Sequence, residues 1–336
     1  MSSDPLSVFQ RFAEAIESDA FVAFEEQFAE RMRTAINKGY ARGKDEPEIV
    51  EAVSSGVNSF GSLAPEHGPG FRIVPESAYI HGFRSQVKFQ YRGSTSQCEL
   101  GDVVYILSIT HGGRVFFERA TFNQVKKADK HLTWHVKPEQ LFLLTSFPTF
   151  RGVAGSWISP DPHNWPNLTG CLGSYGLIYD SDFLFVNARD LLRYLGLKKQ
   201  LNLNQAMRID WWPPFARWLG FLHAPWDGLG ASEYRFAANA AEFSRRFLRF
   251  GIGEILFIPP GAFDNPQARS MKKDLRRGIK SLWDSEHWDN KVESLWKSLS
   301  LPYVGQDPPD DGEPYPVPED PDGPGTGVVH IRIEVE

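Results

Sequence analysis

Residues 98–127 read CELGDVVYILSITHGGRVFFERATFNQVKK, and this stretch decides the fold that we expect. Residues 101–109 are apolar enough to form a strand that is buried on both faces. Residues 111–113, His-Gly-Gly, have the composition of a tight turn. Residues 114–127 return as a second strand, so the stretch is predicted to form a β-hairpin.

The hairpin is predicted to bring together the side chains of a metal-dependent phosphodiesterase. Asp102 opens the first strand, and Gln124 and Lys126 lie on one face near the end of the second, because side chains on a strand alternate. An ionised Asp102 is a strong ligand for Mg²⁺, and the Gln124 carbonyl oxygen is a weaker, neutral one. Lys126 can orient or deprotonate the attacking water and offset charge on the phosphate.

A further carboxylate is expected to complete the metal site, and the sequence leaves its identity open. Glu99 is one candidate, but three residues before Asp102 on a regular strand it faces the other way. Only a bulge at Gly101 would bring both carboxylates to one side. The other candidates are Glu25 and Glu26, on a helix predicted within the first 60 residues by the spacing of its apolar side chains.

These positions resemble the PD-(D/E)XK nuclease superfamily, in its Mrr-like variant with glutamine in the acidic position. Glu99-Leu100-Gly101-Asp102 and Gln124-Val125-Lys126 carry the resemblance, which covers residues 20–150. The resemblance implies a restriction-endonuclease-like α/β core, catalysis by Asp102, Gln124, Lys126 and Glu99, Mg²⁺ or Mn²⁺ as cofactor and DNA as substrate. It also implies a role in restriction or anti-phage defence, as a homodimer or a partner subunit. The family's upstream helical glutamate would fall on Glu25 or Glu26.

The expected fold class is α/β, with a mixed β-sheet flanked by helices and a C-terminal mixed or helical extension. Residues 1–150 would form the nuclease-like core, and residues 151–300 would pack on it. Residues 301–325 contain eight prolines and predict an acidic, extended linker. Residues 326–336 alternate in polarity and predict a terminal strand added to a sheet edge.

The charge of the chain is divided unevenly along its length. The net charge is −6, but residues 301–336 hold nine acidic residues and one arginine, which leaves +2 for residues 1–300. The acidic average therefore excludes neither an enzyme nor a DNA-binding protein. The basic side chains expected to contact a phosphate backbone are Lys127 and Lys130 beside the hairpin, and Lys272, Lys273, Arg276 and Arg277 on a helix that begins after Asn265. A simple solvated helix face is the alternative for the second group.

Composition excludes several other classes of protein. Two cysteines cannot make a disulfide scaffold or a four-cysteine zinc site. No apolar run approaches the ~20 residues of a membrane helix, and the first residues lack the apolar region of a signal peptide, so a cytoplasmic protein is expected. The leading prediction is a Mg²⁺-dependent DNA nuclease. The alternatives are a degenerate nuclease fold that only binds nucleic acid or protein, and a hydrolase of another phosphorylated ligand.

Overall fold

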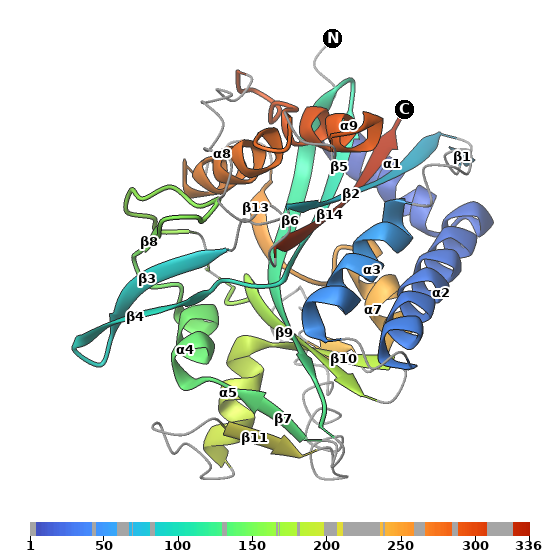
Figure 1. Ribbon diagram of the computed structural model, residues 1–336. Helices are drawn as coiled ribbons and strands as arrows, with labels where there is room; N and C mark the ends of the chain where they lie inside the picture. The colour runs from blue at the N-terminus through green and yellow to red at the C-terminus, as the bar shows by residue number, and fades with distance from the viewer. Residues whose placement is uncertain are drawn as a thin grey trace.

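A nine-stranded mixed sheet forms the centre of the molecule (Figure 1). The computed structural model describes residues 5–41, 45–58, 67–68, 70–80, 85–129, 133–165, 167, 169–179, 182–197, 207–210, 236–237, 239–258, 266–283, 288–307 and 325–336. The sheet has the order β1-β2-β14-β5-β6-β9-β10-β12, and β13 also pairs with β6. Its strands are β1 (His67–Gly68), β2 (Phe71–Ile80), β5 (Val103–His111), β6 (Arg114–Lys127), β9 (Gly173–Tyr179), β10 (Asp182–Asn187), β12 (Phe236–Ala237), β13 (Glu254–Phe257) and β14 (Thr326–Val335). The predicted α/β class with a mixed sheet flanked by helices is confirmed.

The hairpin predicted from residues 98–127 is present as β5 and β6. The two strands pair antiparallel from His111 and Arg114 at the turn to Val103 and Asn123 at the open end. Gly112 and Gly113 have φ angles of 55° and 72°, in the left-handed region that glycine adopts without strain. Strands from both sides of residue 150 share the sheet, because β9 pairs parallel to β6.

The C-terminal strand β14 lies inside the sheet, and not at its edge as the sequence predicted. It pairs antiparallel with β2 over its whole length and parallel with β5 from Gly327 to Glu334. Every residue from 326 to 331 is buried. The alternation of polar and apolar residues is compatible with an edge strand as well as with an interior one. In the structure the polar side chain of His330 is buried. The predicted linker lies mostly outside the described residues.

Helices cover both faces of the sheet (Figure 1). One face packs against α1 (Pro5–Ile16), α2 (Asp19–Ala41), α3 (Glu46–Asn58) and α7 (Ala240–Leu248), with phenylalanines of α2 and α7 in the core. The other face packs against α4 (Pro138–Ser146), α5 (Ala188–Leu197), α8 (Pro266–Lys280) and α9 (Asn290–Leu299). None of the helices in the described ranges is both long enough and apolar enough to cross a membrane.

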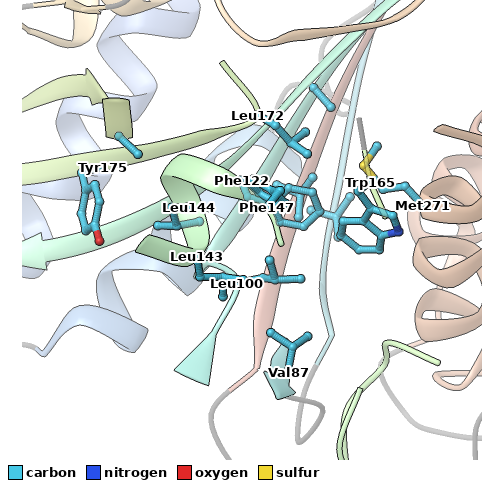
Figure 2. Close-up of a cluster of buried hydrophobic side chains, with 14 of the residues drawn as sticks. Val87, Leu100, Phe122, Leu143, Leu144, Phe147, Trp165, Leu172, Tyr175 and Met271 are labelled. Atoms are coloured by element: carbon cyan, nitrogen blue, oxygen red, sulfur yellow. The ribbon is translucent and has the colours of Figure 1, made fainter. Parts of the chain in front are cut away.

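A three-stranded sheet lies beside the large one. Its apolar side chains pack in the same cluster as those of α4, α5, α8 and α9. It has the order β4-β3-β8, with β3 at Gln86–Tyr91, β4 at Ser94–Glu99 and β8 at Phe150–Gly152. A two-stranded sheet pairs β7 (Thr133–Val136) with β11 (Met207–Asp210). Figure 2 shows the apolar cluster that reaches from Val87 of the small sheet through Phe122 of β6 to Met271 of α8.

The interior position of β14 predicts a large cost for truncating its side chains. Ile331 is fully buried, so Ile331→Ala should lower the free energy of unfolding by about 2–5 kcal/mol, with an unchanged denaturant slope. Leu6→Ala, at a side chain that is 76% exposed on α1, is the control and should change it by less than about 0.5 kcal/mol. If Ile331→Ala and Leu6→Ala both changed the free energy of unfolding by the same small amount in urea titrations, β14 would lie outside the core.

Candidate functional site

The candidate site lies where the chain passes from the small sheet into the large one. Strand β4 ends at Glu99, and Asp102 precedes β5 and donates its backbone N–H to the Asn123 carbonyl at 2.9 Å. A Cβ on Gly101 would lie 3.2 Å from that same carbonyl oxygen, so glycine permits the close approach. The bulge that we considered within one strand is therefore absent. Glu99 and Asp102 instead belong to the ends of two different strands.

Asp102 is held through one of its two carboxylate oxygens. The Gln124 side chain donates its Nε2–H to Oδ2 at 2.5 Å, and the backbone N–H of Val125 donates to the same oxygen at 2.7 Å. Oδ1 accepts no hydrogen bond from the described residues. The 22-residue spacing thus predicted correctly that Asp102 and Gln124 meet across the hairpin. One oxygen remains open to a further partner.

A glutamate that the sequence reasoning missed supplies the acid next to Lys126. Glu46, at the first turn of α3, accepts from the Lys126 ammonium at 2.9 Å through Oε2. Its Oε1 accepts from the backbone N–H of Lys127 at 2.9 Å. Glu46 therefore bridges α3 to the end of β6 and fixes the Lys126 side chain. The sequence offers several helical glutamates, and only the packing of α3 on the sheet selects this one.

The structure does not bring Glu25 or Glu26 to Asp102. Glu25 is buried on α2 and forms an ion pair with Arg249, whose Nε lies 2.7 Å from Oε1. Glu26 is exposed on the neighbouring face of the same helix. The prediction that one of these two residues is a metal ligand is therefore corrected, since Glu25 is already neutralised by an arginine. Glu46 occupies the place that we had expected them to fill.

A second missed residue, Gln140 of α4, controls the orientation of Gln124. Its side-chain amide is buried and donates both to the Glu99 backbone carbonyl, at 3.2 Å, and to Gln124 Oε1. A carbonyl oxygen can only accept, so the Gln140 amide nitrogen faces it. Gln124 must then turn its oxygen toward Gln140 and its N–H toward Asp102. In this arrangement the Gln124 oxygen faces away from Asp102, and its role as a metal ligand stays a prediction.

The environment of Asp102 favours its protonated form. The pKa of Asp102 is raised to about 7, mainly by desolvation and to a smaller extent by the negative charges of Glu99 and Glu46, while Lys126 and the Val125 N–H oppose the shift. Three acidic groups thus lie close enough to repel one another. Such crowding is the usual electrostatic setting of a functional carboxylate.

Tyr175 lies next to this group and was also missed. It is the register partner of Gln124 on β9, and its hydroxyl is buried without a hydrogen-bond partner among the described residues. Desolvation raises its pKa well above the ordinary value, and Cys98 and Asp102 add to the rise. Figure 2 shows its ring at one end of the apolar cluster. No sequence pattern distinguishes it from the other tyrosines.

The basic residues predicted to contact nucleic acid fall into three groups. Lys127 is partly buried with its ammonium 5.2 Å from the Tyr40 ring centre, and Lys130 lies outside the described residues. Lys272 and Arg276 are buried, so their prediction as solvent-facing phosphate contacts is wrong. Lys272 pairs with Glu118 at 3.1 Å in the interior. Lys273 and Arg277 are partly exposed on α8.

The residues present fit a hydrated divalent cation better than an all-protein metal cage. The described part of the chain contains no group of three or more His, Cys, Asp and Glu side chains arranged to hold a metal ion. Mg²⁺ is commonly held by one or two carboxylates and keeps several waters. The open Oδ1 of Asp102, close to the negative charges of Glu46 and Glu99, suits that mode, because a cation there would offset the burial and the repulsion that together raise the Asp102 pKa.

Comparison with known proteins leaves the site to be interpreted from its own geometry. No protein-family model matches the chain, and neither the curated proteins nor the solved structures include a significant match.

The raised pKa of Asp102 predicts a pH-dependent cost in stability. The folded pKa of about 7 lies above the ordinary value of 3.8, so the folded state binds this proton more tightly than the unfolded state does. The contribution of the Asp102 carboxyl to the free energy of unfolding is fully present below about pH 4, and it is lost as the pH rises to about 7. Relative to the wild type, Asp102→Asn should therefore gain about 1–3 kcal/mol between pH 4 and pH 8, measured by urea unfolding. A difference that does not vary with pH would contradict this assignment.

Gln140 predicts a second stability effect. Gln140→Leu removes the donor to the buried Glu99 carbonyl and to Gln124 Oε1, and should cost about 1–3 kcal/mol of unfolding free energy. Gln10→Leu is the matched control, because Gln10 also donates to an acceptor, Glu14, but on the surface. It should cost less than about 0.5 kcal/mol. Equal losses in the two variants would mean that Gln140 does not hold the site.

Proposed function

We propose that the chain is a metal-dependent nuclease that hydrolyses phosphodiester bonds in DNA. The observation that carries the proposal is the arrangement of Asp102. One of its carboxylate oxygens is held by two N–H donors and the other is open, beside the Lys126–Glu46 pair and close to the charge of Glu99. The E-x-G-D and Q-x-K resemblance supports the same reading, since its residues converge in space.

Each side chain has a defined task in this proposal. Asp102 and Glu46 would hold Mg²⁺ or Mn²⁺ together with water, and the metal supplies the Lewis acidity that polarises a phosphoryl oxygen. Lys126 places a positive charge where negative charge develops on the phosphate, and Glu46 fixes its direction. Gln124, positioned by Gln140, keeps the Asp102 carboxylate in one orientation. A bound cation or a pH above about 7 would favour the ionised form of Asp102.

A second candidate function, nucleic-acid binding without catalysis, is favoured by one specific observation. Gln124 directs its N–H, and not its oxygen, toward Asp102. A site that has lost its metal would adopt this arrangement, because the amide then replaces the cation as the partner of the carboxylate. The two candidates differ in whether a divalent metal binds at Asp102.

Cleavage assays test the leading proposal directly. The purified protein should cut DNA in Mg²⁺ or Mn²⁺, and Lys126→Ala should lower the cleavage rate at least about 100-fold, because the charge facing the phosphate is lost. Lys297→Ala, at an exposed lysine of α9, is the control and should retain full activity. The proposal fails if no DNA or RNA is cut with either metal, or if Lys126→Ala cuts as fast as the wild type.

Gln124→Glu separates the two candidates by metal binding. In a functional site the added carboxylate should preserve or raise the affinity for Mn²⁺ in calorimetry, and Mn²⁺ should raise the melting temperature of the variant. In a site without metal function neither the wild type nor the variant should bind Mn²⁺. Gln10→Glu adds the same charge on the surface of α1 and should behave as the wild type does.

A further inference from the structure

The three-stranded sheet has two unlike faces. Its inner face carries Val87, Phe89 and Tyr91, and the last two pack against Phe142 of α4 at ring distances of 6.2 and 5.2 Å. Its outer face is polar. The residues on the outer face are Gln86, Lys88 and Gln90 of β3, Thr95, Gln97 and Glu99 of β4, and Arg151 of β8.

The outer face is continuous with the candidate site. The register pairs Gln86 with Glu99, then Lys88 with both Gln97 and Arg151, then Gln90 with Thr95. Side chains of paired residues lie on the same side of a sheet. The row therefore begins at Glu99, whose charge acts on Asp102, and extends along β4 to Thr95, about 13 Å away.

Apart from Glu99, the charged side chains on this face are positive. Lys88 and Arg151 are exposed and adjacent in the register, and neither forms an ion pair or a hydrogen bond with another side chain in the described ranges. Arg92, at the turn that joins β3 to β4, is also exposed, but its guanidinium lies 5.4 Å from the centre of the Tyr91 ring and is not part of the outer face. Glu99 is the one acidic residue in the sequences of the three strands, and it stands at the end nearest the site.

The remaining outer side chains are neutral hydrogen-bonding groups. Gln97 donates to Gln86 at 2.7 Å, and Gln90 donates to Thr95 at 3.0 Å. Amides and hydroxyls of this kind contact phosphate and sugar oxygens without reading sequence. The outer face thus places two neighbouring cations, Lys88 and Arg151, among neutral polar side chains. None of its residues has an apolar side chain.

We propose that the outer face of the β3–β4–β8 sheet is a docking surface for the phosphate backbone of DNA, with Lys88 and Arg151 as its principal contacts. The proposal rests on the proposed nuclease function only for the direction of the strand, which would run along β4 toward Glu99 and Asp102. Charge complementarity selects the occupant, because a polyanion offers neighbouring negative charges to match Lys88 and Arg151. Contacts from Lys88 and Arg151 to two DNA phosphates on one side of the cleaved bond would position the substrate without selecting its sequence.

Binding measured without cleavage tests the docking surface. The protein is titrated in EDTA against fluorescein-labelled duplex DNA and single-stranded DNA of mixed sequence, followed by anisotropy at several salt concentrations. Lys88→Gln/Arg151→Gln should weaken binding about tenfold and reduce the slope of log K against log salt by about 1.8 for duplex DNA, since each lost phosphate contact removes about 0.9. The reduction should be the same for unrelated sequences.

Two further variants make the result independent of folding. Arg33→Gln/Lys297→Gln removes the same charge from exposed side chains of α2 and α9, and should leave the affinity unchanged. Thr95→Lys adds a cation to the exposed outer face and should tighten binding with a steeper salt slope. A misfolded protein would not gain affinity.

The outcomes distinguish this proposal from the nuclease proposal. If the wild type cuts DNA but Lys88→Gln/Arg151→Gln binds with unchanged affinity and slope, the docking surface is wrong and the nuclease stands. If the double variant loses affinity while the wild type cuts nothing, the docking surface stands and the nuclease is wrong. If the wild type binds neither form of DNA, or if the Arg33/Lys297 control falls equally, the docking surface is overturned.

Discussion

The whole architecture depends on the insertion of the C-terminal strand between β2 and β5. Without β14 the sheet would present two unpaired edges at its centre, and unpaired backbone groups cannot remain buried. The side chains of β14 serve both faces of the sheet. Val329, Ile331 and Ile333 enter the core under α1, α2 and α3, and Val328 enters the opposite one. The last ten strand residues therefore join the two apolar clusters of the molecule.

A buried polar row locks this strand in its register. His330 of β14 lies between Ser108 of β5, at 2.8 Å, and Glu76 of β2, at 3.9 Å, and Ser108 donates to Glu118 of β6 at 2.8 Å. A carboxylate only accepts, so the Ser108 hydrogen points to Glu118 and His330 donates from Nε2. The lone pair on His330 Nδ1 then faces Glu76. Burial raises the pKa of Glu76 and lowers that of His330, which favours a neutral pair with the proton on the carboxyl.

The same row explains why Lys272 of α8 does not reach solvent. Lys272 of α8 neutralises the Glu118 carboxylate, whose other oxygen accepts from the Tyr303 hydroxyl at 2.5 Å. The lysine spacing on α8 is compatible with a solvated face, and the sequence carries no sign that a glutamate 154 residues earlier needs a cation. Asp102 and Gln124 were predictable because a hairpin fixes their proximity locally. Glu46 and Gln140 were not, because each reaches the site from a helix whose position only the tertiary packing defines.

The location of Asp102 between two sheets links its chemistry to the stability of both. Its backbone is fixed by β6 through Asn123, and the chain that leads to it is the end of β4, whose last carbonyl holds Gln140. A carboxylate held so rigidly in a buried place beside Glu99 and Glu46 can reach neither water nor a position away from their charges, so burial first and these charges second raise its pKa. An asparagine would avoid this cost while preserving the shape, so packing alone gives no reason for an acid here. The acid is understandable if a positive partner belongs at its open oxygen, which is what the proposed metal site would supply.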